Sequence, residues 1–442
     1  MASTLPTQPA PQQSRRERLI AWWENRDVDI NIRQWLAVAA LTGLAAALLR
    51  EPVLAVVAVA IALVGLGLRL WWDHALDNLT YQRRFSASRA FFGDEVTVEL
   101  TAINAKPLPL TRLEVVETTS PQVHVRGRQM ERNPEAHGHL LRTMFSLGMY
   151  ERVTHRYTMT CHRRGWHRFG PVTLAANDPF GMVVRRSQID RTEGVLVYPR
   201  IVPVSELVVP ARQPLGDRKP ATPLVEDPMR MSGVRPYVPG DSPRRIHWRA
   251  TARTGELQTR VFEPSATPMA AIFLDTITFS HLWEGQDSGM LELSVMVAAS
   301  LAAQMLEGRY QVGMYANAPI PNHARAVRIP PGRRPGQLTH ILEQLAMLVP
   351  AFGDRIETMI ARELPRLPWG ASVVIVTCRA TADLQRTLLR LARSGSMQRF
   401  VVIAIGEQPP LLPELRRRVT VYHLGTEEAW DAITRIQLAR IA

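Results

Sequence analysis

Cysteine and lysine are both scarce in this chain of 442 residues. The two cysteines, Cys161 and Cys378, lie far apart in segments of different pattern, so the sequence contains no framework for disulfides. Neither CxxC nor HExxH spacing occurs, so a structural zinc site and a zinc protease both lack a motif. The 12 histidines are mostly isolated, and we interpret them as exposed or singly hydrogen-bonded side chains.

The basic charge comes almost entirely from arginine, because Lys106 and Lys219 are the only lysines among 53 basic residues. The net charge of +13 is spread along the chain as far as Arg440, without a lysine-rich run. A nucleic-acid footprint should gather on one face, so the sequence predicts no nucleic-acid partner. Attraction to a membrane surface is the better interpretation of the charge. The hydrophobic fraction of 46% excludes a largely disordered protein.

Long apolar runs occur near the N-terminus, over residues 34–49 and 53–68. Each run alone is shorter than the roughly 20 residues that cross about 30 Å of hydrocarbon. Arg33 and Arg69 can extend the runs because arginine side chains snorkel towards the headgroups, and the neighbouring tryptophans prefer the interface. The sequence therefore predicts a two-helix transmembrane hairpin over residues 33–72.

Arginines flank this hairpin on both sides, in a basic tail over residues 1–32 and in the segment that begins at Asp73. The turn between the runs has only Arg50, which Glu51 offsets. By the positive-inside rule, both termini face the cytoplasm. A signal peptide is disfavoured because a second apolar run follows the first at once. The alternative is an apolar helical hairpin inside a soluble core.

The next segment has a period of two, with apolar and polar side chains alternating as they do from Val96 to Leu100. This pattern and frequent turn signals predict an all-β sandwich over residues 73–202. Towards its end, Asp178-Pro179 predicts a turn that Phe180 anchors.

Prolines then dominate residues 203–232, which predicts an extended and semi-rigid linker. Apolar runs alternate with helical patterns after residue 265. The expected strands cover residues 270–274, 310–315, 372–377, 400–405 and 419–424, and the expected helices cover 291–306, 337–348, 382–393 and a last one from Glu427. Continuous apolar strands between helices predict an α/β domain over residues 265–442, with a mostly parallel sheet covered on both faces.

The segment over residues 233–264 packs a turn, a basic helix and a strand into a short stretch. A tight turn is expected at Val238-Pro239-Gly240-Asp241, and Asp241 or Ser242 can cap a helix that begins at Pro243. Thr254-Gly255 ends that helix. The residues that we single out, as a partner-docking site or as a clasp between domains, are Tyr237, Pro239, Gly240, Asp241, Arg244, Arg245, His247, Trp248, Arg249 and Arg253.

The block from Arg235 to Phe262, with Arg163-Arg164-Gly165, Asp178-Pro179-Phe180-Gly181 and Tyr198-Pro199, resembles the bacterial proteins grouped as domain-of-unknown-function family 58. The resemblance covers most of the chain and implies an α/β domain similar to a von Willebrand factor A domain. It further implies a partner, an AAA+ ATPase of the MoxR type, often with a membrane-bound transglutaminase-like protein. The implied location is the bacterial inner membrane.

Von Willebrand factor A domains commonly bind a divalent cation through an Asp-x-Ser-x-Ser loop, a Thr and a later Asp. Here the first loop runs from Asp275 to Ser280 with apolar residues at both serine positions, and Thr377 is followed by Cys378 rather than Asp. A hard cation needs several oxygen ligands, so the sequence predicts a degenerate site without metal, and no other cofactor. Asp275 is expected to cap the following turn or to pair with an arginine.

Three functions remain open. In the first, the protein is a non-enzymatic, membrane-anchored adaptor whose α/β domain and basic helix are presented to the AAA+ ATPase, since arginine suits carboxylates at interfaces. In the second, it is a membrane scaffold without an ATPase partner. In the third, Asp241 and His247 form the acid/base pair of an enzyme, although no nucleophile or oxyanion-hole motif lies alongside. A clasp would instead use Asp241 as a cap and Trp248 to fill a hole between domains.

Overall fold

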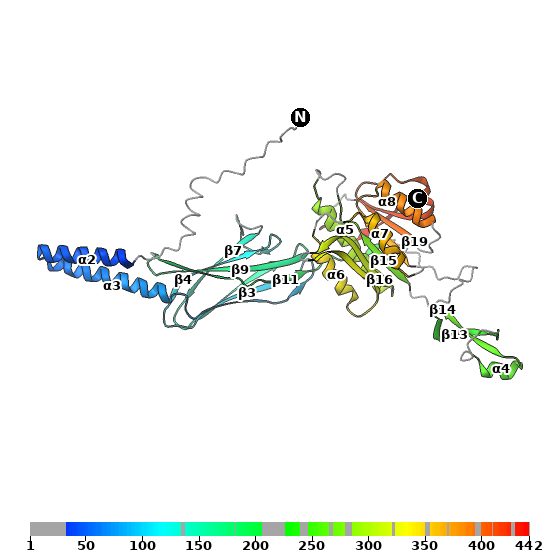
Figure 1. Ribbon diagram of the computed structural model, residues 1–442, viewed down its shortest axis with the longest axis horizontal. Coiled ribbons are helices and arrows are strands. Elements are labelled where there is room, and N and C mark those ends of the chain that lie inside the picture. The colour runs from blue at the N-terminus through cyan, green and yellow to red at the C-terminus, as the bar shows by residue number, and fades with distance from the viewer. Residues whose placement is uncertain are drawn as a thin grey trace, which may run out of the picture. The chain divides into compact units, whose positions relative to one another are not determined.

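The structure is a computed structural model that describes residues 32–133, 138–181, 183–205, 226–238, 246–264, 268–278, 285–320, 323–349, 354–368, 371–393, 399–408, 410–425 and 429–441. The chain divides into two compact units, residues 1–197 and 198–442 (Figure 1). The basic tail and residues 206–225 of the expected linker lie outside the described residues.

The first unit begins with two apolar helices, α2 (Ile32–Leu49) and α3 (Pro52–His74), which match the expected hairpin. Arg50 ends α2 in the left-handed conformation, with φ of 57°, and the Glu51 N–H donates to the Ala46 carbonyl at 3.1 Å. This bonding satisfies one of the last carbonyls of α2, and Pro52 then starts α3 where a missing N–H costs nothing.

Small residues form the contact between the two helices. Ala39, Ala46, Ala58 and Gly65 are buried. A Cβ atom on Gly65 would lie 3.0 Å from the Trp35 Cβ, so glycine is what allows Trp35 to pack there. Close approach over small residues is typical of helices that associate in a membrane.

Large apolar side chains cover the outside of the hairpin, with Leu41, Leu48 and Val56 each about 70% exposed or more. The alternative of a hairpin inside a soluble core is therefore wrong. By length and hydropathy α3 can cross a membrane, and α5 (Ser288–Glu307) also passes this test, but 72% of the apolar window of α5 is buried against 11% for α3. We interpret α5 as a core helix and α3 as the membrane candidate.

The rest of the first unit is the expected β-sandwich. Its strands are β1 (Leu79–Phe85), β2 (Arg89–Ala90), β3 (Glu95–Asn104), β4 (Leu110–Thr119), β5 (His124–Val125), β6 (Glu131–Arg132), β7 (His139–Leu147), β8 (Arg152–Thr160), β9 (Gly165–Asn177), β10 (Val184–Ile189) and β11 (Glu193–Val197). One sheet has the order β1-β3-β8-β5, and the other has the order β2-β11-β9-β4-β7-β6 with β10 paired to β9.

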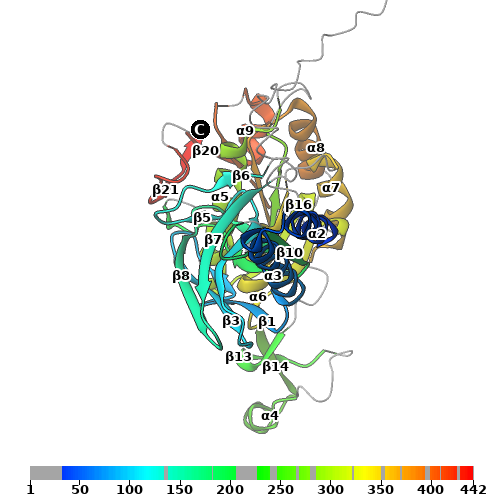
Figure 2. The same ribbon diagram turned by 90° about the vertical axis from the view of Figure 1, so that its left-hand side faces the viewer.

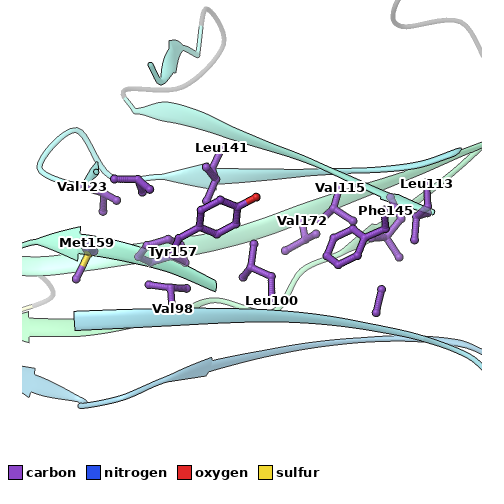
Figure 3. Close-up of a cluster of buried hydrophobic side chains, with 14 of the residues drawn as sticks. Val98, Leu100, Leu113, Val115, Val123, Leu141, Phe145, Tyr157, Met159 and Val172 are labelled. Atoms are coloured by element: carbon purple, nitrogen blue, oxygen red, sulfur yellow. The ribbon is translucent and has the colours of Figure 1, made fainter. Parts of the chain in front are cut away.

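The two sheets share one core, which Figure 3 shows filled by side chains from both layers. Val98 and Leu100 of β3 are fully buried, as the alternation predicts, and they face Leu113 and Val115 of β4. Trp71 and Ala75, at the end of α3, belong to the same core. The helical hairpin is thus joined to the sandwich by packing as well as by the chain.

A buried ion pair links the two sheets. Arg83 of β1 lies 2.9 Å from Glu117 of β4, with side chains 3% and 0% exposed. Arg83 also donates to the Phe169 carbonyl at 2.8 Å, and the Tyr81 hydroxyl donates to Glu117. Burial raises the pKa of Glu117, and Arg83 and Tyr81 oppose that rise. The carboxylate therefore depends on Arg83 to remain ionised inside the sandwich.

We expect Arg83→Met to lower the free energy of unfolding by about 3–5 kcal/mol, because it leaves a buried carboxylate without its charge partner. Denaturant unfolding of the full chain in detergent measures the change. Arg84→Met is the matched control, since Arg84 is the neighbouring residue of β1 and is exposed. Equal effects of the two substitutions would contradict the structural role of the pair.

The second unit is built on a seven-stranded sheet with the order β17-β16-β15-β18-β19-β20-β22. These strands are β15 (Met269–Leu274), β16 (Gln311–Ile320), β17 (His323–Gly332), β18 (Ser372–Thr377), β19 (Arg399–Ile405), β20 (Thr420–Leu424) and β22 (Ala439–Ile441). The five central strands pair in parallel, and β17 and β22 add antiparallel edges, so the sheet is mixed.

Helices cover this sheet on both faces. They are α5, α6 (Gln337–Met347), α7 (Ile356–Glu363), α8 (Ala382–Arg393) and α9 (Pro413–Arg418), and α7, α8 and α9 share one hydrophobic core with β15 and β18. The expected strands are present, and so are the expected helices except the last, since no helix forms over residues 429–441, where a turn leads to β21 (Ile436–Gln437) and β22. The helices α7 and α9 and the edge strands β17 and β22 were not expected.

A separate two-stranded sheet pairs β13 (Glu226–Pro236) with β14 (Gln258–Pro264), and α4 (Trp248–Thr254) lies between them in sequence. The expected linker over residues 203–232 therefore contains the short β12 (Val204–Ser205), which pairs with β21, and the first part of β13. Proline content concealed this strand, because prolines disfavour a ladder but are tolerated where a two-stranded ribbon leaves N–H positions unpaired.

Candidate functional site

The sequence motif folds as a small unit of β13, α4 and β14, which we call the motif module. The Tyr237 N–H donates to the Leu257 carbonyl at 2.8 Å, and the His247 N–H donates to the Gln258 carbonyl at 2.7 Å. These bonds fix both chain segments that lead to and from α4. Five of the singled-out residues lie outside the described residues, namely Pro239, Gly240, Asp241, Arg244 and Arg245. The structure therefore does not describe most of the expected tight turn or the expected helix cap.

Helix α4 starts later than expected, at Trp248 rather than at Pro243. Ile246 forms a β-bridge with Thr259 instead of a helical turn, and His247 is the N-cap. The His247 Nδ1 atom accepts a hydrogen bond from the Ala250 N–H at 3.0 Å. The predicted end is confirmed, since Gly255 has φ of 75° and its N–H donates to the Thr251 carbonyl.

The side chains of α4 are turned to solvent. Trp248 is 66% exposed, and its expected place in a hole between domains stays a prediction. Arg249 and Arg253 are exposed on the same short helix. Val238 and Leu257, at the two ends of the loop that holds α4, are 54% and 44% exposed. We call these exposed residues the module surface, and they combine apolar and basic groups: Trp248, Arg249, Arg253, Val238 and Leu257.

The proposed acid/base pair gains no support from this geometry. Asp241 is not among the described residues, and the Nδ1 lone pair of His247 is occupied by the Ala250 N–H. Nδ1 is therefore engaged in capping, which leaves only Nε2 for proton transfer. No nucleophile lies beside His247 in the described sequence of the module.

A second candidate lies at the carboxyl ends of three parallel strands. Asp275 follows β15, Asn317 lies near the end of β16, and Thr377 ends β18. The register aligns Leu274 with both Ala316 and Val376. The residues that follow them, Asp275, Asn317 and Thr377, therefore lie at the same level of the sheet. The chain leaves β15 towards β16 and later returns to β18 on the other side, and ligand sites of α/β sheets form at such a change of direction.

Hydrogen bonds join these residues into a buried network. Asn317 Nδ2 donates to Asp275 Oδ1 at 2.8 Å, and Thr377 Oγ1 donates to Asp275 Oδ2 at 2.9 Å. The Ile277 N–H donates to Asp275 Oδ1 at 3.2 Å, so Asp275 caps the following turn as expected. Asn317 Oδ1 accepts from both the N–H and the hydroxyl of Thr276 at 2.8 Å. Both oxygens of Asp275 are thus occupied by donors of the protein.

The network is not arranged for a cation. Asp275 is 5% exposed, and burial raises the pKa of its carboxyl, although the donors from Asn317, Thr377 and Ile277 oppose that rise. Among the described residues, no group of three or more His, Cys, Asp or Glu side chains could hold a metal ion. Because both carboxylate oxygens already accept from donors of the protein, Asp275 offers few free ligand positions to a divalent ion.

The two cysteines do not offer a nucleophile. Cys378 lies 3.1 Å from the Ser294 hydroxyl, and burial raises the pKa of its thiol to about 11. Burial likewise raises the pKa of Cys161 to about 11. Both thiols are therefore protonated near neutral pH, and the protonated thiol is a poor nucleophile.

The turn expected at Asp178-Pro179 is present, but Phe180 does not anchor it. Asp178 Oδ2 accepts from the Phe180 N–H at 3.0 Å, and Asp178 Oδ1 accepts from the Val183 N–H at 2.7 Å. Phe180 anchors nothing, because it is 74% exposed, whereas Val183 is fully buried. Asn317, Thr276 and Val183 were not singled out from the sequence, since each lies within an apolar run or beside a stronger turn signal.

The model of the family described as "Protein of unknown function DUF58" matches residues 233–414. This part of the chain belongs to that family. The uncharacterized protein YeaD of Bacillus subtilis (strain 168) is 24% identical over 333 residues, which cover 75% of this chain and 77% of YeaD. The resemblance stated from the motif residues is therefore confirmed, and the matched range includes Asp275, α4, β14 and the end of β13.

Two solved structures are similar to parts of this chain. The CARDB domain of the PF1109 protein from Pyrococcus furiosus is 14% identical, covers 27% of this chain and 91% of its own, and has a TM-score of 0.19. A cohesin module from Clostridium perfringens is 10% identical, covers 27% of this chain and 95% of its own, and also has a TM-score of 0.19. Similarity at this level carries no conclusion about function.

We expect Asp275→Asn to fold, because the amide can accept from Ile277 and Asn317 and donate to Thr377. The folded pKa of Asp275 lies above its ordinary value, so its contribution to stability is complete at low pH and is lost as pH rises through the raised pKa. The Asp275→Asn protein should therefore gain stability relative to wild type as pH increases, by about 1.4 kcal/mol per unit of pKa elevation. Melting temperatures of both proteins across pH measure this, and a constant difference would contradict a buried, raised carboxyl.

Magnesium should leave the melting temperature unchanged, because the oxygens of Asp275 already accept hydrogen bonds from the protein. Titration of MgCl₂ into the full chain in detergent, with a sodium chloride control of equal ionic strength, measures this. A rise with magnesium that Asp275→Ala removes would instead establish a cation site.

Proposed function

We propose that this DUF58 protein is a non-enzymatic, membrane-anchored adaptor that presents the motif module and the α/β unit to an AAA+ ATPase of the MoxR type. The observation that carries the proposal is Trp248, 66% exposed at the start of α4 beside the exposed Arg249. Tryptophan and arginine dominate the energetic centres of protein interfaces. A folded module that exposes both is suited to contact a partner.

The module around Trp248 is ordered by hydrogen bonds that do not involve the Trp248 side chain. The Gln258 N–H donates to the Thr251 hydroxyl at 3.0 Å, and Ile246 bridges to Thr259. Because the module holds α4 without burying Trp248, the tryptophan costs no core packing and remains available. This favours docking over the clasp, in which Trp248 would be buried.

The arginines indicate the chemistry of the partner. Arg249 and Arg253 lie one helical turn apart on α4, which places them on the same face. Their planar guanidinium groups match carboxylates bidentately, so an acidic surface with an apolar pocket suits the module surface. The ATPase as that partner, and a transglutaminase-like membrane protein beside it, follow from the family resemblance.

The α/β unit supports the same proposal. Its parallel centre, with Asp275 after the first strand, is the arrangement expected of a von Willebrand factor A-like domain, and the engaged Asp275 indicates a form that binds partners without metal. Helices α2 and α3 anchor it in the inner membrane, with both termini in the cytoplasm. A scaffold without an ATPase partner is the second candidate, favoured by the junction of α3 with the sandwich core.

We expect Trp248→Ala to weaken ATPase binding by about 2 kcal/mol, which is about 30-fold in affinity, with an unchanged melting curve. Charge reversal at Arg249 and Arg253 should do the same. Co-purification of the ATPase from detergent extracts measures binding. Trp166→Ala is the matched control, since Trp166 is 46% exposed on the sandwich. Unchanged binding by both module variants would reject the docking role.

A further inference from the structure

Three exposed apolar side chains gather at the end of the β-sandwich that follows α3. Met149 and Tyr150, in the turn between β7 and β8, are 62% and 70% exposed, and Phe180, in the turn between β9 and β10, is 74% exposed. Strand pairing brings the two turns to one end, because β4 starts beside both of them, with Leu110 opposite Leu147 and Arg112 opposite Asn177. We call Met149, Tyr150 and Phe180 the apolar tips.

The first turn is tied to the end of α3 by a chain of hydrogen bonds. The Tyr150 N–H donates to the Lys106 carbonyl at 3.2 Å, and Lys106 Nζ donates to the Asp77 carbonyl at 2.7 Å. Asp77 lies three residues beyond His74, the last residue of α3. Tyr150 therefore projects beside the point where the chain leaves the helix.

The second turn reaches further along α3. Val183 packs against Leu68, and the Arg185 guanidinium lies 4.0 Å from the centre of a Trp72 ring. Figure 2, viewed from the helix side, shows β10 beside α2 and α3 in agreement with these contacts. The turn that carries Phe180 is thus held against the last two turns of α3.

The length of α3 sets the depth of these contacts. Its 23 residues, at about 1.5 Å each, span about 35 Å, which is more than the roughly 30 Å of hydrocarbon. With Pro52 at the far side of the membrane, Leu68 lies about 24 Å along the helix, still within the hydrocarbon, and Trp72 lies near its edge. Phe180 is consequently at the level of the acyl and headgroup boundary, and Tyr150 is at the level of the headgroups.

Both turns hold their tips rigidly outward. Asp178 accepts the N–H groups of Phe180 and Val183, so the turn is fixed without help from the Phe180 ring. Tyr150 has φ of 51°, a conformation that is uncommon for a bulky residue, and it is 70% exposed. Arg112 and Arg152 are exposed on the strands just behind the tips, and Arg185 is half-buried. Arginines at headgroup level attract anionic lipids.

We propose that the apolar tips insert into the cytoplasmic face of the bilayer that holds α2 and α3, with Arg112, Arg152 and Arg185 directed to lipid phosphates. This inference rests on the proposed membrane anchoring of the hairpin. The bilayer is the occupant because the patch is continuous with the lipid-facing helix, through Val183 on Leu68 and Arg185 on Trp72. The sandwich is then fixed against the membrane rather than suspended from a flexible tether.

Depth measurements on the full chain test the inference. Four variants each carry one added cysteine, in place of Phe180, Met149, Phe91 or Leu63, and the added cysteine is labelled with a polarity-sensitive fluorophore. Each protein is reconstituted in phosphatidylcholine vesicles that contain phosphatidylglycerol and lipids with a quenching acyl chain. Leu63, 63% exposed on α3, reports the anchor, and Phe91, 50% exposed, reports the opposite end of the sandwich. Phe91 lies near the far end of β8, because the N–H of the nearby Gly93 donates to the carbonyl of Cys161, the residue that follows β8. The unsubstituted protein gives the background from Cys161 and Cys378.

Quenching at positions 180, 149 and 63, without quenching at 91, is the expected result. Quenching at position 180 should lie between the values at positions 63 and 91. In vesicles of phosphatidylcholine without phosphatidylglycerol, quenching at position 180 should fall, because the arginines then have no anionic lipid to contact. Quenching at 63 but not at 180 or 149 would overturn this inference and leave the anchor intact. Absence of quenching at 63 would overturn the proposed anchor itself. Phe180 and Met149 are exposed, so these variants should retain the wild-type melting temperature.

Discussion

The packing of the end of α3 into the β-sandwich is the constraint on which the rest of the first unit depends. Trp71 and Ala75 are 7% and 0% exposed and belong to the same core as the strands of both sheets. A transmembrane helix that ended in a free linker would leave the orientation of the sandwich undefined. Because α3 instead continues into the core, the turns beside it are held at a fixed position along the helix, and the contact that we propose between their exposed apolar residues and the bilayer depends on this.

A rigid junction also needs a sandwich that does not shear, and the pair of Arg83 and Glu117 meets this need. It connects β1, which directly follows α3, to β4 in the opposite sheet, and Arg83 reaches the Phe169 carbonyl of β9. Such a pair is weak support for net stability, because desolvation offsets much of its attraction. We infer that the pair favours the observed register of the two sheets, because another register would separate the two buried charges.

Much of this architecture follows from the sequence, and the exceptions share a physical cause. The hairpin, the alternation around Val98 and the apolar strands of the α/β unit are local patterns that burial imposes. The start of α4 is different, since Asp241 to Pro243 carry strong local helix signals, yet Ile246 pairs with Thr259 across the module. Asn317 lies in an unremarkable strand end, and its contact with Asp275 exists only because three strands are level. Pairings between distant segments decided each of these cases.

The hydrogen bonds of Asp275 and the exposure of Trp248 favour the same location for recognition in the second unit. A sheet of this topology offers a ligand site where the chain changes direction, and here Asn317 and Thr377 donate hydrogen bonds to Asp275 at that place. Trp248, Arg249 and Arg253 supply apolar area and charge on a helix held by backbone bonds. For this reason we locate recognition on the motif module rather than at the strand ends.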